Sequence, residues 1–176
     1  FFMIRVGSLY DQTFLSKPQI DNKTGMDAAE QLSEIFRAVA PLYKKRDKIY
    51  REVAGLLCEK GIAHPQMESL TAEERSFAEK YFIADVLPVL SPQIINAHHP
   101  FPHLVNKALY IVLQMKISDK TAYGIIPMPA MQDRLIFLPG SGMRYVLLEE
   151  LIYQYAERVF DNCEINAKLS LIHISE

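Results

Sequence analysis

The stretch that decides the fold is His98-His99-Pro100-Phe101-Pro102-His103-Leu104-Val105-Asn106. Its two prolines prevent a regular helix, because each fixes φ and removes a backbone N–H donor. Phe101 lies between them as an apolar anchor. We expect its ring to enter the core between a Thr71–Val86 helix and an Ala108–Ile117 strand. Most of the chain before this stretch has helical spacing, and most of the chain after it is typical of strands, turns and one more helix.

The long helix before the stretch is predicted by capping and periodicity. Asp27 begins it, because Glu30 three residues later completes a capping-box pattern. Apolar residues then recur every three or four positions, which predicts one buried stripe. Pro41 is expected to kink or divide this helix, and Gly61 to cap its C-terminus. The spacing between Phe1 and Leu15 predicts another helix in the same domain.

The region after Gly61 predicts mixed structure. Thr71 and Glu74 form a second capping box. The branched and aromatic run Ala108–Ile117 predicts a strand that pairs antiparallel with Tyr123–Ile126. Further along the chain we expect a hairpin turned by Pro139-Gly140-Ser141-Gly142 and an amphipathic helix over Glu149–Val159.

The predicted fold class is therefore α+β. Residues 1–61 form an N-terminal helical domain with long antiparallel helices, and residues 62–168 form an incomplete mixed α+β head domain with antiparallel hairpins. The chain begins at Phe1 without an initiator methionine, so we expect a fragment of a longer protein whose first domain lacks its start. Residues 169–176 resemble a translated adapter, and we exclude them from the fold as a non-native tail. The alternative is a genuine amphipathic strand, because Leu169, Leu171, Ile172 and Ile174 are apolar.

Composition excludes several classes of function. The chain has 19 Lys and Arg against 21 Asp and Glu, so it has no net basic field to attract nucleic acid. It contains no apolar run of the roughly 18 residues that a transmembrane helix needs. Cys58 and Cys163 are far apart and lack a CxxC partner. This pattern favours a reducing cytoplasm and buried thiols over a disulfide or zinc site.

Several residues could carry chemistry, and each has a plainer interpretation. His98, His99 and His103 suggest zinc, but no Cys, Asp or Glu lies in their motif, so we expect a structural turn and no metal. Gly140-Ser141-Gly142 is too short to cradle a phosphate and precedes a strand-like run.

Two further sets of polar residues have structural interpretations as well. Adjacent Glu149 and Glu150 point about 100° apart on a helix and cannot share a substrate. They are expected to place negative charge at the positive N-terminus of the last helix. Ser141, Cys58 and Cys163 have no convincing general base at a recognisable sequence spacing, so none is assigned as a catalytic nucleophile.

Four segments together resemble the long-chain, histidine-phosphorylated polyphosphate kinases. The quoted stretch resembles the family signature HPFPHLVNKALYIVL over His99–Leu113. The other three segments follow the family's order and approximate spacing, and they are Phe1–Leu9, Asp133–Pro139 and Val146–Ile152. The resemblance covers nearly all of residues 1–168.

The resemblance implies a parent enzyme that transfers the terminal phosphate of ATP to inorganic polyphosphate through a phosphohistidine, with Mg²⁺. It implies a helical N-terminal domain, a head domain and two C-terminal catalytic domains related to phospholipase D. The histidine nucleophile and the nucleotide-contacting asparagine fall outside this chain, so no catalytic, cofactor-binding or metal residue is assigned. His98, His99 and His103 are not the nucleophile. We expect this portion to be inactive alone and to bind neither ATP nor Mg²⁺.

The same resemblance implies polyphosphate and ATP or ADP as partners of the parent, a homo-oligomer, and a cytoplasmic location with membrane association left open. This portion is then structural and oligomerising. The alternative is a non-catalytic binding or assembly module with the same two domains. The predicted long helix also carries a basic cluster, formed by Lys44-Lys45-Arg46-Asp47-Lys48 and Arg51. Such a cluster suits either a polyanion such as polyphosphate or RNA, or a solvated helix face with (i, i+4) pairs, which we prefer.

Overall fold

The computed structural model describes residues 2–17, 19–97, 99, 101–105, 108–117, 120–160 and 163–173. Its internal contacts divide the chain into two units, with the boundary between Leu56 and Leu57. Each unit is described by itself. Among the described helices, none is both long enough and apolar enough to span a bilayer.

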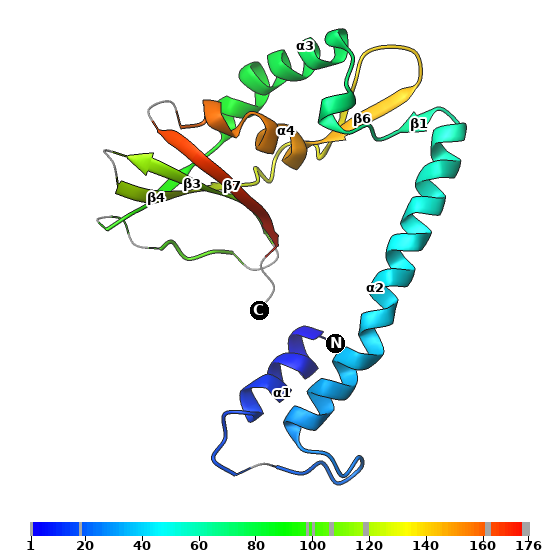
Figure 1. Ribbon diagram of the computed structural model, residues 1–176, viewed down its shortest axis with the longest axis vertical. Coiled ribbons are helices and arrows are strands. Elements are labelled where there is room, and N and C mark those ends of the chain that lie inside the picture. The colour runs from blue at the N-terminus through cyan, green and yellow to red at the C-terminus, as the bar shows by residue number, and fades with distance from the viewer. Residues whose placement is uncertain are drawn as a thin grey trace. The chain divides into compact units, whose positions relative to one another are not determined.

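The helices and strands follow one another as a helical section and then a mixed section (Figure 1). The helical section comprises the π-helical turn η1 (Phe2–Val6), α1 (Gly7–Gln12) and α2 (Ala28–Glu59). The mixed section begins with β1 (Ile62–Ala63), η2 (Met67–Ser69), α3 (Ala72–Tyr81), η3 (Phe82–Val86), η4 (Leu87–Val89) and β2 (Gln93–Ile95). It continues with β3 (Leu109–Ile117), β4 (Lys120–Pro127), β5 (Leu135–Phe137), β6 (Met143–Leu147), α4 (Leu148–Gln154), η5 (Ala156–Arg158) and β7 (Glu164–His173).

In the first unit, α1 packs against the beginning of α2 through a small apolar cluster. Leu9, Ala28 and Leu32 are buried there, and Figure 1 shows α1 beside that part of α2. The predicted capping box is confirmed: the Glu30 backbone N–H donates to Asp27 Oδ1 at 2.9 Å, and the Asp27 N–H donates to Glu30 Oε2 at 3.0 Å. The fold class α+β is confirmed as well, with one long N-terminal helix in the described chain.

Two expectations about α2, its division at Pro41 and the burial of its whole apolar stripe, were wrong, while a kink at Pro41 stays a prediction. The helix is continuous through Pro41 and is not divided, because a proline removes only one hydrogen bond from a helix of 32 residues. The apolar stripe is buried only at its start, because α1 is too short to cover the rest. The large apolar residues beyond that contact are exposed, and they are Phe36, Leu42, Tyr43, Ile49, Tyr50, Val53, Leu56 and Leu57.

The second unit is built on a four-stranded sheet in the order β2-β4-β3-β7. Strands β3 and β4 pair antiparallel, as predicted, with Val112 opposite Ile125. Alternate β3 residues Ile111, Leu113 and Met115 face the core and are fully buried. They pack with helical residues such as Phe82, Val86 and Leu151 in one cluster, and α3 and α4 lie on one side of this sheet in Figure 1.

Gly124 is required by the same packing. It lies on β4 opposite Leu113. A Cβ added there would lie 2.4 Å from Met115 Cε and 2.7 Å from Phe160 Cζ. The glycine therefore makes room on the core face for two large side chains.

A second, smaller sheet in the order β1-β6-β5 belongs to the same unit. Gly61 caps α2 with φ +80°, and its carbonyl accepts from the Met143 N–H at 2.9 Å. Strand β1 then pairs parallel with β6. A Cβ on Gly142 would lie 3.3 Å from the Gly61 carbonyl oxygen, and Gly142 itself has φ +108°. Both glycines are therefore needed where the two segments meet.

The position predicted for Phe101 was wrong. Its side chain is 67% exposed, and it lies on the face of the four-stranded sheet opposite the main core, beside Val112 and Ile125. The alternation along β3 explains the difference, because the core face is already filled by the residues that alternate with Val112. The flanking residue Pro100 lies outside the described residues.

Excluding residues 169–176 from the fold was also wrong for the described part of that segment. Strand β7 extends to His173 and pairs antiparallel with β3, with Ser170 opposite Val112 and His173 opposite Leu109. An apolar sequence with strand-like alternation has the composition to add such a strand. The suggested adapter origin of residues 169–176 stays a prediction, and residues 174–176 lie outside the described part.

Candidate functional site

The two described histidines of the motif, His99 and His103, have different surroundings. His99 is held in a local turn: its backbone N–H donates to Asn96 Oδ1 at 3.0 Å, and its Nδ1 lies 3.1 Å from the same oxygen. His103 is exposed, and His98 lies outside the described residues. Within the described ranges, no group of three or more His, Cys, Asp or Glu side chains could hold a metal ion. The expectation that the motif binds no metal stays a prediction, because His98 is not among the described residues.

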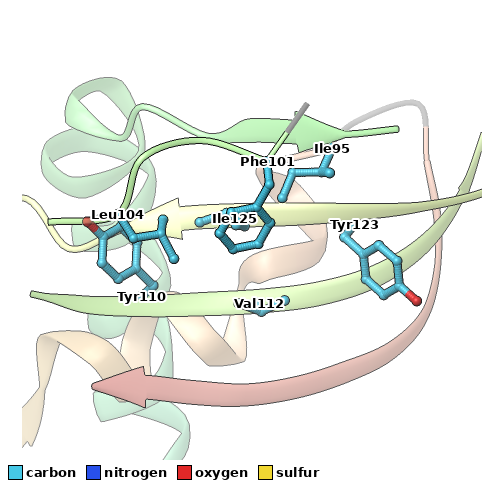
Figure 2. Close-up of a pocket in the computed structure, with 7 residues that line it drawn as sticks. All are labelled: Ile95, Phe101, Leu104, Tyr110, Val112, Tyr123 and Ile125. Atoms are coloured by element: carbon cyan, nitrogen blue, oxygen red, sulfur yellow. The ribbon is translucent and has the colours of Figure 1, made fainter. Parts of the chain in front are cut away.

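The motif instead borders an apolar cavity of about 420 Å³ on the outer face of the four-stranded sheet. Figure 2 shows side chains from three strands and the motif directed to it. They are Ile95, Phe101, Leu104, Tyr110, Val112, Tyr123 and Ile125. The Val105 backbone N–H donates to the Tyr110 hydroxyl at 2.7 Å and holds the motif over β3. A cavity lined in this way suits an apolar group and not a phosphate.

Two ion pairs and one contact between a histidine and a carboxylate surround the junction of β6 and α4, and the sequence pattern did not reveal these three pairs. Arg144 Nε donates to Glu74 Oε1 at 2.6 Å, and the Glu74 side chain is only 5% exposed. This hydrogen bond lowers the pKa of Glu74 from its ordinary value of 4.5, against the opposing effect of burial. Thr71 adds to the same environment, because its N–H donates to Glu74 Oε2 at 2.9 Å in the predicted capping box.

The second pair joins Arg134 to Glu149. Arg134 Nε donates to Glu149 Oε1 at 2.8 Å, and this hydrogen bond raises the pKa of the guanidinium. Glu149 is buried, and its Oε2 has no hydrogen-bond partner among the described residues. The Glu149 carboxylate was expected to place negative charge at the positive N-terminus of the last helix. It lies in the first turn of α4, but its direct partner is an arginine 15 residues earlier in the sequence.

The third pair lies within the second unit and joins the segment after β1 to α4. His64 Nε2 lies 2.8 Å from Glu150 Oε2, and the His64 ring stacks on Tyr145 with centroids 5.1 Å apart. Glu150 Oε2 also accepts from the Leu147 N–H at 3.0 Å, so the predicted role at the start of α4 is confirmed for Glu150. His64 and Glu150 are 86 residues apart in sequence, so no local spacing could indicate their contact.

Of the remaining candidates, the glycine-rich turn is as predicted, whereas the expected burial of both cysteines is wrong for Cys58. Gly140-Ser141-Gly142 connects β5 to β6, which pair antiparallel, so this segment is the predicted hairpin turn. Cys58 is an exposed free thiol and Cys163 a partly buried one. Neither has a described hydrogen bond to a base.

The basic cluster on α2 is fully exposed. Lys48 Nζ lies 3.8 Å from Glu52 Oε1 and Arg46 Nη2 lies 2.7 Å from Asp47 Oδ1. Arg46 also lies over the Tyr43 ring, 5.2 Å from its centroid. The predicted (i, i+4) pairing is therefore present, but only for part of the cluster.

Comparisons with known proteins agree with this fold. Residues 1–64 match the family described as the polyphosphate kinase N-terminal domain, and residues 73–172 match the polyphosphate kinase middle domain. Polyphosphate kinase from Bacillus cereus is 34% identical over 176 residues, which cover 95% of this chain and 25% of that protein. The Halalkalibacterium halodurans enzyme is 34% identical over 166 residues, covering 91% of this chain and 24% of that protein.

A solved structure shows the same fold. Polyphosphate kinase from Porphyromonas gingivalis superimposes with a TM-score of 0.68 at 18% identity, over 95% of this chain and 25% of that one. The chain thus spans about a quarter of the length of the relatives that it matches. With matches to two consecutive domains covering most of its residues, the chain belongs to the polyphosphate kinase family.

Proposed function

We propose that this chain is the N-terminal and middle part of a polyphosphate kinase that transfers the terminal phosphate of ATP to inorganic polyphosphate through a phosphohistidine. The observation that carries the proposal is the pair of consecutive family matches, residues 1–64 and 73–172, among relatives named polyphosphate kinase. Mg²⁺, ATP and the reacting histidine would then be held by parts of the parent protein outside this chain.

In this proposal the chain positions other parts of a cytoplasmic homo-oligomer and performs no phosphoryl transfer itself. The arrangement at the end of α2 supports a positioning role. The segment that follows α2 contacts β6 and α4 through the Gly61 carbonyl, strand β1 and the His64–Glu150 pair. These contacts order the segment after α2 within the second unit.

The test is ATP-dependent synthesis of polyphosphate by the purified chain and by the intact parent protein. Phosphoryl transfer needs a positioned nucleophile, Mg²⁺ and cationic groups around the phosphates. The intact protein should release one ADP for each phosphate that is added to polyphosphate. The 176-residue chain should form neither product. Synthesis by the chain alone would contradict the division of roles. An intact gene product that binds polyphosphate without forming it from ATP would favour the non-catalytic assembly module.

A further inference from the structure

Basic residues are concentrated in one part of a chain that is acidic overall. Residues 37–52 contain six Lys and Arg and two Asp and Glu, while the whole chain has a formal net charge of −2. All of these charged residues belong to α2, and all of them are exposed. The local excess of positive charge is therefore carried on one continuous helix.

The cations lie along one face of that helix. Arg37, Lys44, Lys48 and Arg51 follow one another at intervals of seven, four and three residues, the spacings that bring side chains to the same face. We call these four residues the basic face of α2. At 1.5 Å per residue it is about 21 Å long. The apolar residues Leu42 and Val53 lie about half a turn away around the helix.

The basic face is only partly neutralised by neighbouring carboxylates. Arg37 pairs with Glu34, and Lys48 with Glu52, but the side chains of both cations are at least 75% exposed. Exposed pairs of this kind contribute little and exchange readily. Lys44 forms no ion pair within the described part of the chain, and Arg51 Nε donates to the Asp47 carbonyl oxygen at 3.1 Å. The face therefore keeps charge available for a ligand.

We propose that the basic face of α2 binds inorganic polyphosphate. The ligand class rests on the proposed function, whereas the geometry concerns this helix alone. A linear polyanion that spans several cations releases its bound counterions, which favours binding in a salt-dependent way. Single-stranded nucleic acid would also need aromatic platforms on which bases stack. The tyrosines of α2, Tyr43 and Tyr50, lie toward the apolar side of the helix, so the face offers contacts to phosphates without contacts to bases.

The experiment measures binding of labelled long-chain polyphosphate to the purified chain at several salt concentrations. The test variant is Lys44→Glu/Lys48→Glu/Arg51→Glu. The matched control is Lys23→Glu/Lys80→Glu/Lys120→Glu, which changes net charge equally at exposed positions outside the face. The test variant should bind at least about tenfold more weakly and show a salt dependence smaller by about two released ions, and the control should retain most of the affinity. Circular dichroism confirms that each variant folds.

Three results would overturn the proposal. They are no binding by the unaltered chain, equal weakening in both triple variants, and equal affinity for a single-stranded RNA of the same charge. Polyphosphate synthesis by the intact parent is measured separately. If the intact enzyme is active while the test variant binds polyphosphate normally, the inference about α2 fails and the proposed function stands.

Discussion

Glu74 and Arg144 form a two-bond ion pair between α3 and β6, although 70 residues separate them in sequence. Arg144 Nε lies 2.6 Å from Glu74 Oε1 and Nη2 lies 3.2 Å from Oε2. The carboxylate is 5% exposed and the guanidinium 35%. Because the Glu74 carboxylate is largely removed from water, its ionised form depends on Arg144 for stabilisation.

Replacing Arg144 with Ala should therefore lower the free energy of unfolding by about 2–3 kcal/mol, because it leaves a buried carboxylate without its main partner. Urea denaturation at neutral pH measures the change. The control is Arg158→Ala, which removes an exposed pair with Glu79 and should cost less than about 1 kcal/mol. Equal losses in the two variants would show that burial of Glu74 does not strengthen its dependence on Arg144.

Acid should remove the stabilisation that Glu74 provides. The pKa of Glu74 is lowered in the folded protein, with the hydrogen bond from Arg144 as the largest cause. The folded state therefore binds this proton less readily than the unfolded state. The contribution is complete above the ordinary pKa of 4.5 and is lost as the pH falls through the lower folded value.

The variant Glu74→Gln tests this pH dependence. It should be less stable than the unaltered chain at pH 7, and its stability should fall less steeply below pH 4.5. Thermal unfolding between pH 3 and 7 gives both curves. If the stability of both proteins falls equally steeply below pH 4.5, the acid sensitivity comes from other carboxylates.

Phe101 and Phe82 should respond very differently to truncation. Phe101 is 67% exposed, whereas Phe82 is fully buried in the main core. We expect Phe101→Ala to cost below about 1 kcal/mol and Phe82→Ala about 3–5 kcal/mol, because only the second creates a cavity in packed surroundings. Urea denaturation of both variants checks this. A large cost at Phe101 would mean that its ring is covered in solution.

The contrast between these two phenylalanines shows how far sequence reasoning extends. Local signals predicted the capping boxes at Asp27 and Thr71, the β3–β4 pair and the hairpin turn at Gly140, because each depends on residues close in sequence. The face of the sheet that Phe101 contacts depends on which β3 residues fill the core, and nothing in the motif itself specifies that.

The same reasoning explains what was missed at the candidate site. The partners of Glu74, Glu149 and Glu150 are 70, 15 and 86 residues away, so pairing follows from the topology of two sheets. The short strands β1 and β2 were missed because two or three residues carry no period. The apolar stripe of α2 was predicted correctly as a pattern, but a periodic stripe does not state whether a partner for it lies within the same chain.

The final prediction concerns β7. Residues Ser170 to His173 pair with Val112 to Leu109, so a chain ending at Lys168 would leave that part of β3 with one neighbouring strand instead of two. Loss of about two net backbone hydrogen bonds should lower the free energy of unfolding by about 2 kcal/mol. Hydrogen exchange of the amides from Tyr110 to Val112 should also become faster. Both are measured against a control that lacks only residues 174–176. Unchanged stability and exchange in the chain ending at Lys168 would show that residues 169–173 do not belong to the folded sheet in solution, as first predicted from their sequence.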